Sequence, residues 1–278
     1  MLWETLTPCC RLGDNLGVNS AGAYPSLRSE VDRLAPTFLP SGRTPLIQRA
    51  RSPRLDEFQA VPWLSLLDGT QRERALDDLR VVDAQPGDMI CKIGRPANFW
   101  FGVIDGLMKM SNDASVGFSI TFTGIPPGAW FGEGTLLKRE AYRYNIEALR
   151  PTVVAGLTAQ TFSWLLESSI PFNRYVMNQL NERLGQFIAA READRVSDPD
   201  ARVARSLAAL FNPVLYPLVG RMLRITQQEL AYLVGLSRQR VNESLKVLAA
   251  AGLIQVEYGG LRVLDLDGLR RFDADRLA

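Results

Sequence analysis

Residues 225–245 carry, in order, the start of one helix, a sharp turn and the start of a second helix. Thr226 and Glu229 have the spacing of a capping box, in which a hydroxyl and a carboxylate bind amides that the first helical turn leaves free. Gly235 follows where the chain must turn, and Ser237 can cap the next helix. This succession predicts a helix-turn-helix.

The second predicted helix, which Gly252 is expected to end, has a packing side and a polar side. At about 100° per residue, the packing side is formed by Val241, Ser244, Leu245 and Leu248. The polar side is formed by Arg238, Gln239, Asn242, Glu243 and Lys246, with Arg240 at its flank. In the major groove arginine and lysine can bind guanine, glutamine and asparagine can bind adenine, and glutamate can bind cytosine. We therefore expect this side to contact bases and Arg240 to contact phosphate.

Two further features extend the predicted DNA-binding surface. Thr226, Gln227 and Ser237 lie at the two helix starts, and β-prone runs on either side of residues 258–260 predict a hairpin wing. Residues 221–246 hold five basic and two acidic side chains, a local charge of 5 − 2 = +3, whereas the whole chain carries +2. Solvation alone could explain one polar helix face, but the ordered succession of caps, turn and wing favours DNA binding.

Residues 80–160 have a different pattern, in which short β-prone runs alternate with glycine-containing turns. The runs are Val81-Val82, Met89-Ile90, Phe99 to Ile104, Leu107 to Met110, Phe118 to Phe122, Trp130-Phe131 and Val153 to Leu157. Short strands at such spacing predict a β-sandwich, roll or barrel. Just before them, residues 58–79 have apolar side chains at helical spacing.

A long helix is expected from Pro171, capped by Ser168 or Ser169, to about Val196. Along it, a three-and-four spacing is shared by Met177, Leu180, Leu184, Phe187 and Arg191. This seam favours pairing with the same helix of a second copy, and the alternative is packing on the chain's own β-domain. Asp198-Pro199 then begins another helix.

Residues 1–54 are rich in proline, glycine, serine and arginine without a sustained period, which predicts a disordered extension. Its end carries Arg43, Arg49, Arg51 and Arg54, and a DNA-touching arm is the alternative to a solvated tail. The predicted division is an extension over 1–54, a β-domain over 55–168, a dimerisation helix over 169–197 and a DNA-binding domain over 198–278.

The composition disfavours whole classes of function. The chain has no histidine, which removes serine-histidine-aspartate triads, HExxH zinc sites and haem bound through histidine. Its three cysteines lack paired spacing, which disfavours disulfide frameworks and thiolate zinc or iron-sulfur sites. We expect no catalytic residues and no metal. With neither a long apolar run nor a signal peptide evident, a cytoplasmic protein without a membrane partner is expected.

The chain from Phe58 to Phe272 resembles the Crp/Fnr family of bacterial transcription regulators. The resemblance is carried by Leu236-Ser237-Arg238-Gln239-Arg240-Val241-Asn242, Leu245, Leu248, Ala251-Gly252-Leu253-Ile254, and upstream by Gly87, Gly94, Gly106, Gly128 and Phe131-Gly132-Glu133. It implies an α+β protein with an N-terminal β-roll resembling a double-stranded jelly roll, a long dimerisation helix and a C-terminal winged helix-turn-helix. It also implies a homodimer that binds palindromic promoter DNA and acts on RNA polymerase.

The resemblance also implies an effector site in the roll. In family members that bind cyclic AMP, a glutamate holds the ribose hydroxyl and an arginine followed by serine or threonine holds the phosphate. Glu133 matches the glutamate, whereas the arginine position falls on Arg143 or Tyr142, and neither is followed by a hydroxyl side chain of that kind. The predicted site, for cyclic AMP or another small anion, comprises Gly132, Glu133, Tyr142, Arg143 and Tyr144. The alternative is a structural ion pair between Glu133 and either Arg139 or Arg143.

These observations distinguish among four functions. The favoured one is a homodimeric regulator gated by a small ligand. The others are a regulator that needs no effector, a cyclic-nucleotide-binding module that controls an enzyme, and a small enzyme. A wing and a base-contacting helix have no use in such a module, and the composition disfavours the enzyme.

Overall fold

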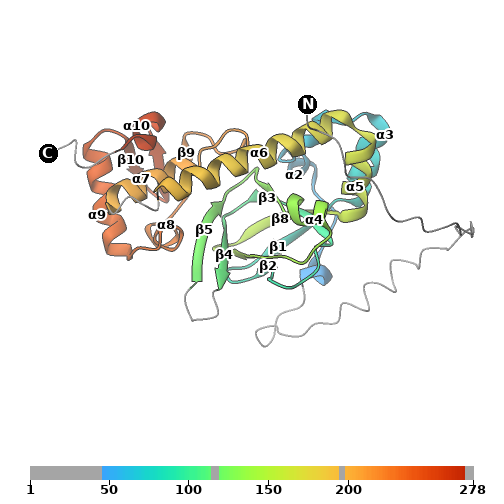
Figure 1. Ribbon diagram of the computed structural model, residues 1–278, viewed down its shortest axis with the longest axis horizontal. Helices are drawn as coiled ribbons and strands as arrows, with labels where there is room; N and C mark the ends of the chain where they lie inside the picture. The colour runs from blue at the N-terminus through green and yellow to red at the C-terminus, as the bar shows by residue number, and fades with distance from the viewer. Residues whose placement is uncertain (1–45, 114–118, 194–197, 273–278) are drawn as a thin grey trace, which may run out of the picture. The chain divides into compact units, whose positions relative to one another are not determined.

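The computed structural model describes residues 46–113, 119–193 and 198–272. In this part of the chain a β-roll is followed by a long helix and a winged helix-turn-helix domain, as predicted (Figure 1). Each described helix is too short or too polar to cross a bilayer.

The roll consists of two antiparallel four-stranded sheets. The first has the order β1 (Arg80–Ala84), β8 (Thr152–Thr158), β3 (Phe99–Asp105) and β6 (Trp130–Phe131). The second has the order β2 (Met89–Cys91), β7 (Asn145–Ala148), β4 (Met108–Asp113) and β5 (Ser119–Ile125). Buried side chains from both sheets, among them Val103, Ile125 and Ile146, form one apolar core. Every predicted run overlaps a strand, but β7 was missed because its sequence, Asn-Ile-Glu-Ala, holds few β-formers.

The helical stretch expected over residues 58–79 is broken into shorter pieces. These are α2 (Leu55–Gln59), the 3-10 helix η2 (Pro62–Leu66) and α3 (Gly69–Asp78). Pro62 starts η2, and the Asp68 carboxylate accepts a hydrogen bond from the Gln71 amide at 2.8 Å to start α3. With α5 (Ala159–Ser168) they cover the first sheet over a second core whose largest side chains are Trp63, Trp100, Trp130, Phe162 and Phe172.

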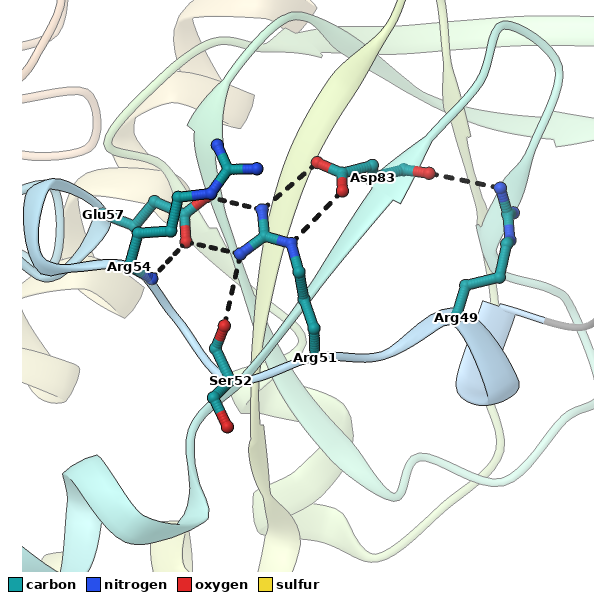
Figure 2. A network of polar contacts seen from close by, with 6 residues as sticks. All are labelled: Arg49, Arg51, Ser52, Arg54, Glu57 and Asp83. Atoms are coloured by element: carbon teal, nitrogen blue, oxygen red, sulfur yellow. Dashed lines mark hydrogen bonds and ion pairs between the residues drawn. The ribbon is translucent and has the colours of Figure 1, made fainter.

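Residues 46–54 are folded onto the roll, in contrast to the disorder expected there. The 3-10 helix η1 (Leu46–Arg49) leads to Arg51, whose backbone pairs with that of Val81 through two hydrogen bonds of 2.8 Å. The Arg51 guanidinium binds Glu57 at 2.6 Å and Asp83 at 3.3 Å (Figure 2). Arg49 forms a similar ion pair with the roll, since its Nη2 lies 2.6 Å from Asp88 Oδ2. These two arginines therefore anchor the segment instead of forming a free arm, and Arg43 lies outside the described residues.

The long helix α6 (Ile170–Ala193) begins beside Ser169, whose Oγ accepts a hydrogen bond from the Phe172 amide at 3.4 Å. Of the predicted seam, Leu180 is half-buried against the aromatic core. Four exposed apolar side chains beyond the first turn of this helix form what we call the outward stripe, namely Met177, Leu184, Phe187 and Ile188. One side of α6 therefore packs against the roll of the same chain, and the outward stripe on the other side is exposed.

The C-terminal domain combines four helices with a small sheet. Its elements are α7 (Pro199–Ala209), β9 (Met222–Leu223), α8 (Gln227–Val234), α9 (Arg238–Ala250), β10 (Ile254–Glu257), β11 (Gly260–Val263) and α10 (Leu266–Arg270). Asp198 caps α7, as expected, by accepting from the Ala201 amide at 2.9 Å. The predicted wing is the β10–β11 hairpin, and β9 adds a third strand that sequence reasoning missed.

Candidate functional site

The helix-turn-helix is built by local contacts. Thr226 Oγ1 accepts from the Glu229 amide at 3.1 Å, and the Glu229 carboxylate accepts from the Thr226 amide at 2.7 Å. Gly235 ends α8 with a left-handed φ of 72°, which a side chain would strain. Ser237 Oγ then accepts from the Arg240 amide at 3.1 Å and starts α9. Both predicted caps and the predicted turn are confirmed.

The two sides of α9 also match the expectation. Val241, Ser244, Leu245 and Leu248 are buried in the domain core. On the opposite side, exposed polar groups are presented by Arg238, Gln239, Glu243 and Lys246. Because these four leave the same side of a packed helix, they can approach one DNA groove together.

Asn242 and Gln227 of the predicted DNA-binding surface contact each other. Both are half-buried, and Gln227 Nε2 donates to Asn242 Oδ1 at 2.9 Å. The contact joins the first turn of α8 to the middle of α9. Part of the hydrogen-bonding capacity of each amide is therefore used within the protein, which the sequence did not indicate.

Arg240 has an intrachain partner. Its Nη2 lies 2.6 Å from Asp200 Oδ1 on α7, and its Nη1 lies 3.7 Å from the Glu243 carboxylate. Ser244 Oγ donates to the same Asp200 oxygen at 2.6 Å. A guanidinium neutralised in this way attracts phosphate less than a free one, so the structure gives Arg240 a role in joining helices.

Sequence reasoning missed two further features near this surface. Arg202 of α7 donates from Nη2 to the carbonyl of Val234 at 2.9 Å. This hydrogen bond provides a partner for one of the carbonyls that the end of α8 leaves without a partner inside the helix. Tyr258, at the tip of the wing, is fully exposed. The Arg202 contact spans distant parts of the chain and leaves no local pattern, whereas an aromatic residue in the predicted turn could have drawn attention to Tyr258.

The second candidate region is the interior of the roll around Glu133. This residue begins α4 (Glu133–Lys138), a short helix that follows Gly132. Glu133 is buried, and its Oε1 accepts from Arg183 Nε of α6 at 3.0 Å. Arg183 Nη2 also donates to the carbonyl of Trp130 at 2.7 Å. The structural ion pair expected with Arg139 or Arg143 is therefore wrong in its partner.

Arg143 points out of the roll, while the neighbouring tyrosines point in. Its side chain is 73% exposed and binds Glu140 at 2.8 Å. Tyr142 is buried and donates to the Phe99 carbonyl at 3.3 Å, and the hydroxyls of Tyr144 and Thr135 lie 3.5 Å apart. Burial raises the pKa of both tyrosines, so they stay neutral. The structure thus brings Gly132, Glu133 and the two tyrosines together and leaves Arg143 outside.

The residues around Glu133 could bind the ribose of a cyclic nucleotide but not its phosphate. Glu133 Oε2 is buried and has no hydrogen-bond partner among the described residues, so it could accept from a ribose hydroxyl. The phosphate would need a cation, but Arg143 faces solvent. The guanidinium of Arg183 does reach the interior of the roll, where the Glu133 carboxylate already binds it. The site therefore does not fit the anionic end of a cyclic nucleotide.

Comparison with known proteins identifies both domains. A family model for the cyclic nucleotide-binding domain matches residues 81–169, and one for the Crp-like helix-turn-helix domain matches residues 201–272. The transcriptional regulator SdrP of Thermus thermophilus is 26% identical over 198 residues, which cover 70% of this chain and 95% of that protein. The cAMP-activated global transcriptional regulator CRP of Haemophilus influenzae is 25% identical over 215 residues, which cover 73% and 94%.

A solved structure supports the same fold. FixK2 from Bradyrhizobium japonicum aligns with a TM-score of 0.57 at 16% identity, over 69% of this chain and 96% of that one. Two matching domains in the same order, full-length relatives and a shared fold agree with the geometry of α8, α9 and the wing. The chain therefore belongs to the Crp/Fnr family of DNA-binding transcription regulators.

Proposed function

We propose that the protein is a homodimer, joined along α6, that binds a two-fold related promoter site and thereby recruits or blocks RNA polymerase. The observation that carries the dimer is the outward stripe on a helix of 24 residues, where Met177 is 62% exposed and Leu184 59% exposed. Contiguous exposed apolar side chains are typical of a protein interface. A second copy of α6 would cover them and relate the two DNA-binding domains by a two-fold axis.

The DNA contacts are assigned from exposure and position. Arg238 and Gln239, in the first turn of α9, are proposed to contact base edges, and Glu243 and Lys246 extend this row along the helix. Thr226, Gln227 and Ser237 lie at helix starts, where free amides and small polar groups bind phosphate. Arg240 and Asn242 are proposed to support these contacts through Asp200 and Gln227.

The remaining parts of the proposal concern setting and organisation. A promoter-binding regulator without catalytic activity acts in the cytoplasm, where the DNA is. We place the domain boundaries at residues 168 and 197, between which α6 connects the roll to the DNA-binding domain. The matches to residues 81–169 and 201–272 support this division.

Control of DNA binding through the roll has two candidate forms. The first is gating by a small ligand, cyclic AMP or another small anion, which the cyclic nucleotide-binding match and a relative named as cAMP-activated support. The second is DNA binding without an effector. The ion pair between Glu133 and Arg183 favours the second, because the buried carboxylate already has a cationic partner.

Selection of duplexes from a random pool by the full chain tests the proposal, with and without cyclic AMP. We expect enrichment of a palindrome whose half-sites lie about 10–10.5 bp apart, centre to centre, or at a multiple of that spacing. Binding should weaken steeply with salt because phosphate contacts release counterions. A pool that shows no enriched sequence under either condition would contradict the proposal.

A further inference from the structure

Arg150 connects the roll to the first helix of the helix-turn-helix. It lies in the turn between β7 and β8, and its Nε is 3.0 Å from Glu229 Oε1 on α8. Its Nη2 also donates a hydrogen bond to the carbonyl of Arg224, in the segment before α8. The Arg150 side chain is 24% exposed and that of Glu229 is 11% exposed, so solvent screens their attraction only in part. One guanidinium therefore binds both the start of α8 and the segment that leads to it.

Glu229 is also the carboxylate of the capping box. Its Oε2 accepts from the Thr226 amide at 2.7 Å, while its Oε1 faces Arg150. The same first turn of α8 is proposed to approach a DNA phosphate, which an unpaired carboxylate would repel. Because Arg150 neutralises it, Glu229 can cap α8 without leaving an uncompensated negative charge beside the DNA.

Apolar contacts hold the rest of α8 on the roll. Gly124 of β5 leaves room for Leu233 of α8, since a Cβ at this glycine would lie 2.7 Å from Leu233 Cδ1. Leu107 of the roll is part of the apolar core of the DNA-binding domain, and Leu149 packs against that core. The helix is thus held against the roll near both of its ends.

We propose that Arg150 is a positioning residue for DNA binding. Acting through Glu229, it holds the first turn of α8 against the roll and compensates the negative charge that would repel phosphate. The roll is thereby part of the DNA-binding unit. This inference rests on the proposed DNA-binding function and adds to it a residue that lies outside the helix-turn-helix.

The test measures the affinity of the full chain for its selected duplex by fluorescence anisotropy, at fixed salt and under the condition used for the selection. Arg150→Met removes the guanidinium, and Arg150→Lys keeps the charge without the planar fork that reaches two partners. Glu229→Gln removes the charge of the carboxylate, and glutamine still serves in a capping box. The matched control is Arg143→Met, which removes the same charge at the other end of β7, where Glu140 binds the arginine.

We expect Arg150→Met to bind the duplex about 5- to 150-fold more weakly than the wild type, the range typical of coupling between sites. Arg150→Lys should recover part of this loss, and the exposed control should stay within about twofold of the wild type. In the Glu229→Gln background, Arg150→Met should change the affinity by less than about twofold, because the arginine acts through that carboxylate. Thermal unfolding and gel filtration of each variant report folding and assembly separately from DNA affinity.

Two results would overturn the inference. One is wild-type affinity in a folded Arg150→Met variant, which would make the ion pair merely structural. The other is an equal loss from Arg150→Met in the wild type and in the Glu229→Gln background, which would mean that Arg150 contacts phosphate directly. Failure of the underlying function would look different, because neither the wild type nor the Arg143→Met control would then prefer any duplex sequence.

Discussion

The guanidinium of Arg240 lies 2.6 Å from the carboxylate of Asp200 and joins α9 to the first turn of α7. The position of Asp200 favours its negative charge, because the start of a helix carries a partial positive charge. Ser244 donates to the same oxygen, so one carboxylate holds two side chains of α9. The orientation of α9, the helix proposed to contact DNA, therefore depends on a carboxylate of another helix.

Asp200→Asn should destabilise the C-terminal domain by about 1–3 kcal/mol, because a charge-assisted hydrogen bond is lost and Arg240 loses its main partner. Urea unfolding followed by circular dichroism measures the change. Glu243→Gln is the control, since that exposed carboxylate lies 3.7 Å from Arg240 and should contribute less than about 1 kcal/mol. Equal effects of the two substitutions would argue against the assigned role of Asp200.

Glu57 gives the roll a stability that depends on pH. Its hydrogen bonds from Arg51 lower its pKa, outweighing the effect of burial, and a lowered folded-state pKa stabilises the fold above the unfolded pKa. That stability is lost as the pH falls through the folded pKa. At pH 7 we expect Glu57→Gln to unfold about 1–3 kcal/mol more easily than the wild type.

The gap in unfolding free energy between these two proteins should begin to narrow below about pH 4, near the unfolded pKa of glutamate, and close as the pH falls through the lower folded pKa. Tryptophan fluorescence distinguishes the roll from the DNA-binding domain, because all five tryptophans of the chain lie before residue 165. Glu73→Gln, on the exposed side of α3, controls for a general loss of charge. A gap of constant size from pH 7 to pH 3 would refute the account.

Gly102 is needed for close packing of the roll, because a Cβ at this position would overlap the Trp130 ring. Gly102→Ala should lower the free energy of unfolding by about 1–3 kcal/mol as the aromatic core shifts. Gly69→Ala is the matched control, since nothing lies within 4 Å of the place that its Cβ would take and a helix favours alanine. If both substitutions are tolerated equally, the contact between β3 and β6 is looser than described.

Leu184→Glu should convert the proposed dimer into a folded monomer, because a carboxylate would be buried in the middle of the outward stripe. Sedimentation velocity at micromolar concentration measures the oligomeric state. Asn178→Glu adds the same charge to another exposed side of α6 and should leave the dimer intact. A wild type that is monomeric while folded would exclude pairing along α6, although DNA binding by each domain could persist.

The helix-turn-helix could be predicted from sequence because its determinants are local. Each cap joins residues three positions apart, as in Thr226 with Glu229, and the α9 periodicity separates its two sides. The roll was predicted at the level of its strands because glycine-containing turns separate them. What could not be predicted are contacts between distant segments, such as Arg240 with Asp200, 40 residues apart, and Arg183 with Glu133, 50 residues apart.

The effector region shows the limit of a position-by-position resemblance. Counting along the chain placed Arg143 at an anion site, but burial alternates there, so that Tyr142 faces the interior and Arg143 faces solvent. The succession Tyr-Arg-Tyr contains that alternation and could have indicated it. Arg183, in contrast, lies within a helix whose periodicity pointed to dimerisation, and its direction follows from the tertiary packing of α6.

The central claim is that α9 recognises DNA sequence, and Arg238 tests it most directly. The measurement is the affinity of the wild type and of Arg238→Ala for the selected duplex and for each single-base-pair variant of it, at fixed salt concentration. We expect Arg238→Ala to lose about 1–3 kcal/mol of discrimination at one position in each half-site and to keep the wild-type profile at the others. An unchanged profile at every position would contradict the claim that this side of α9 contacts bases.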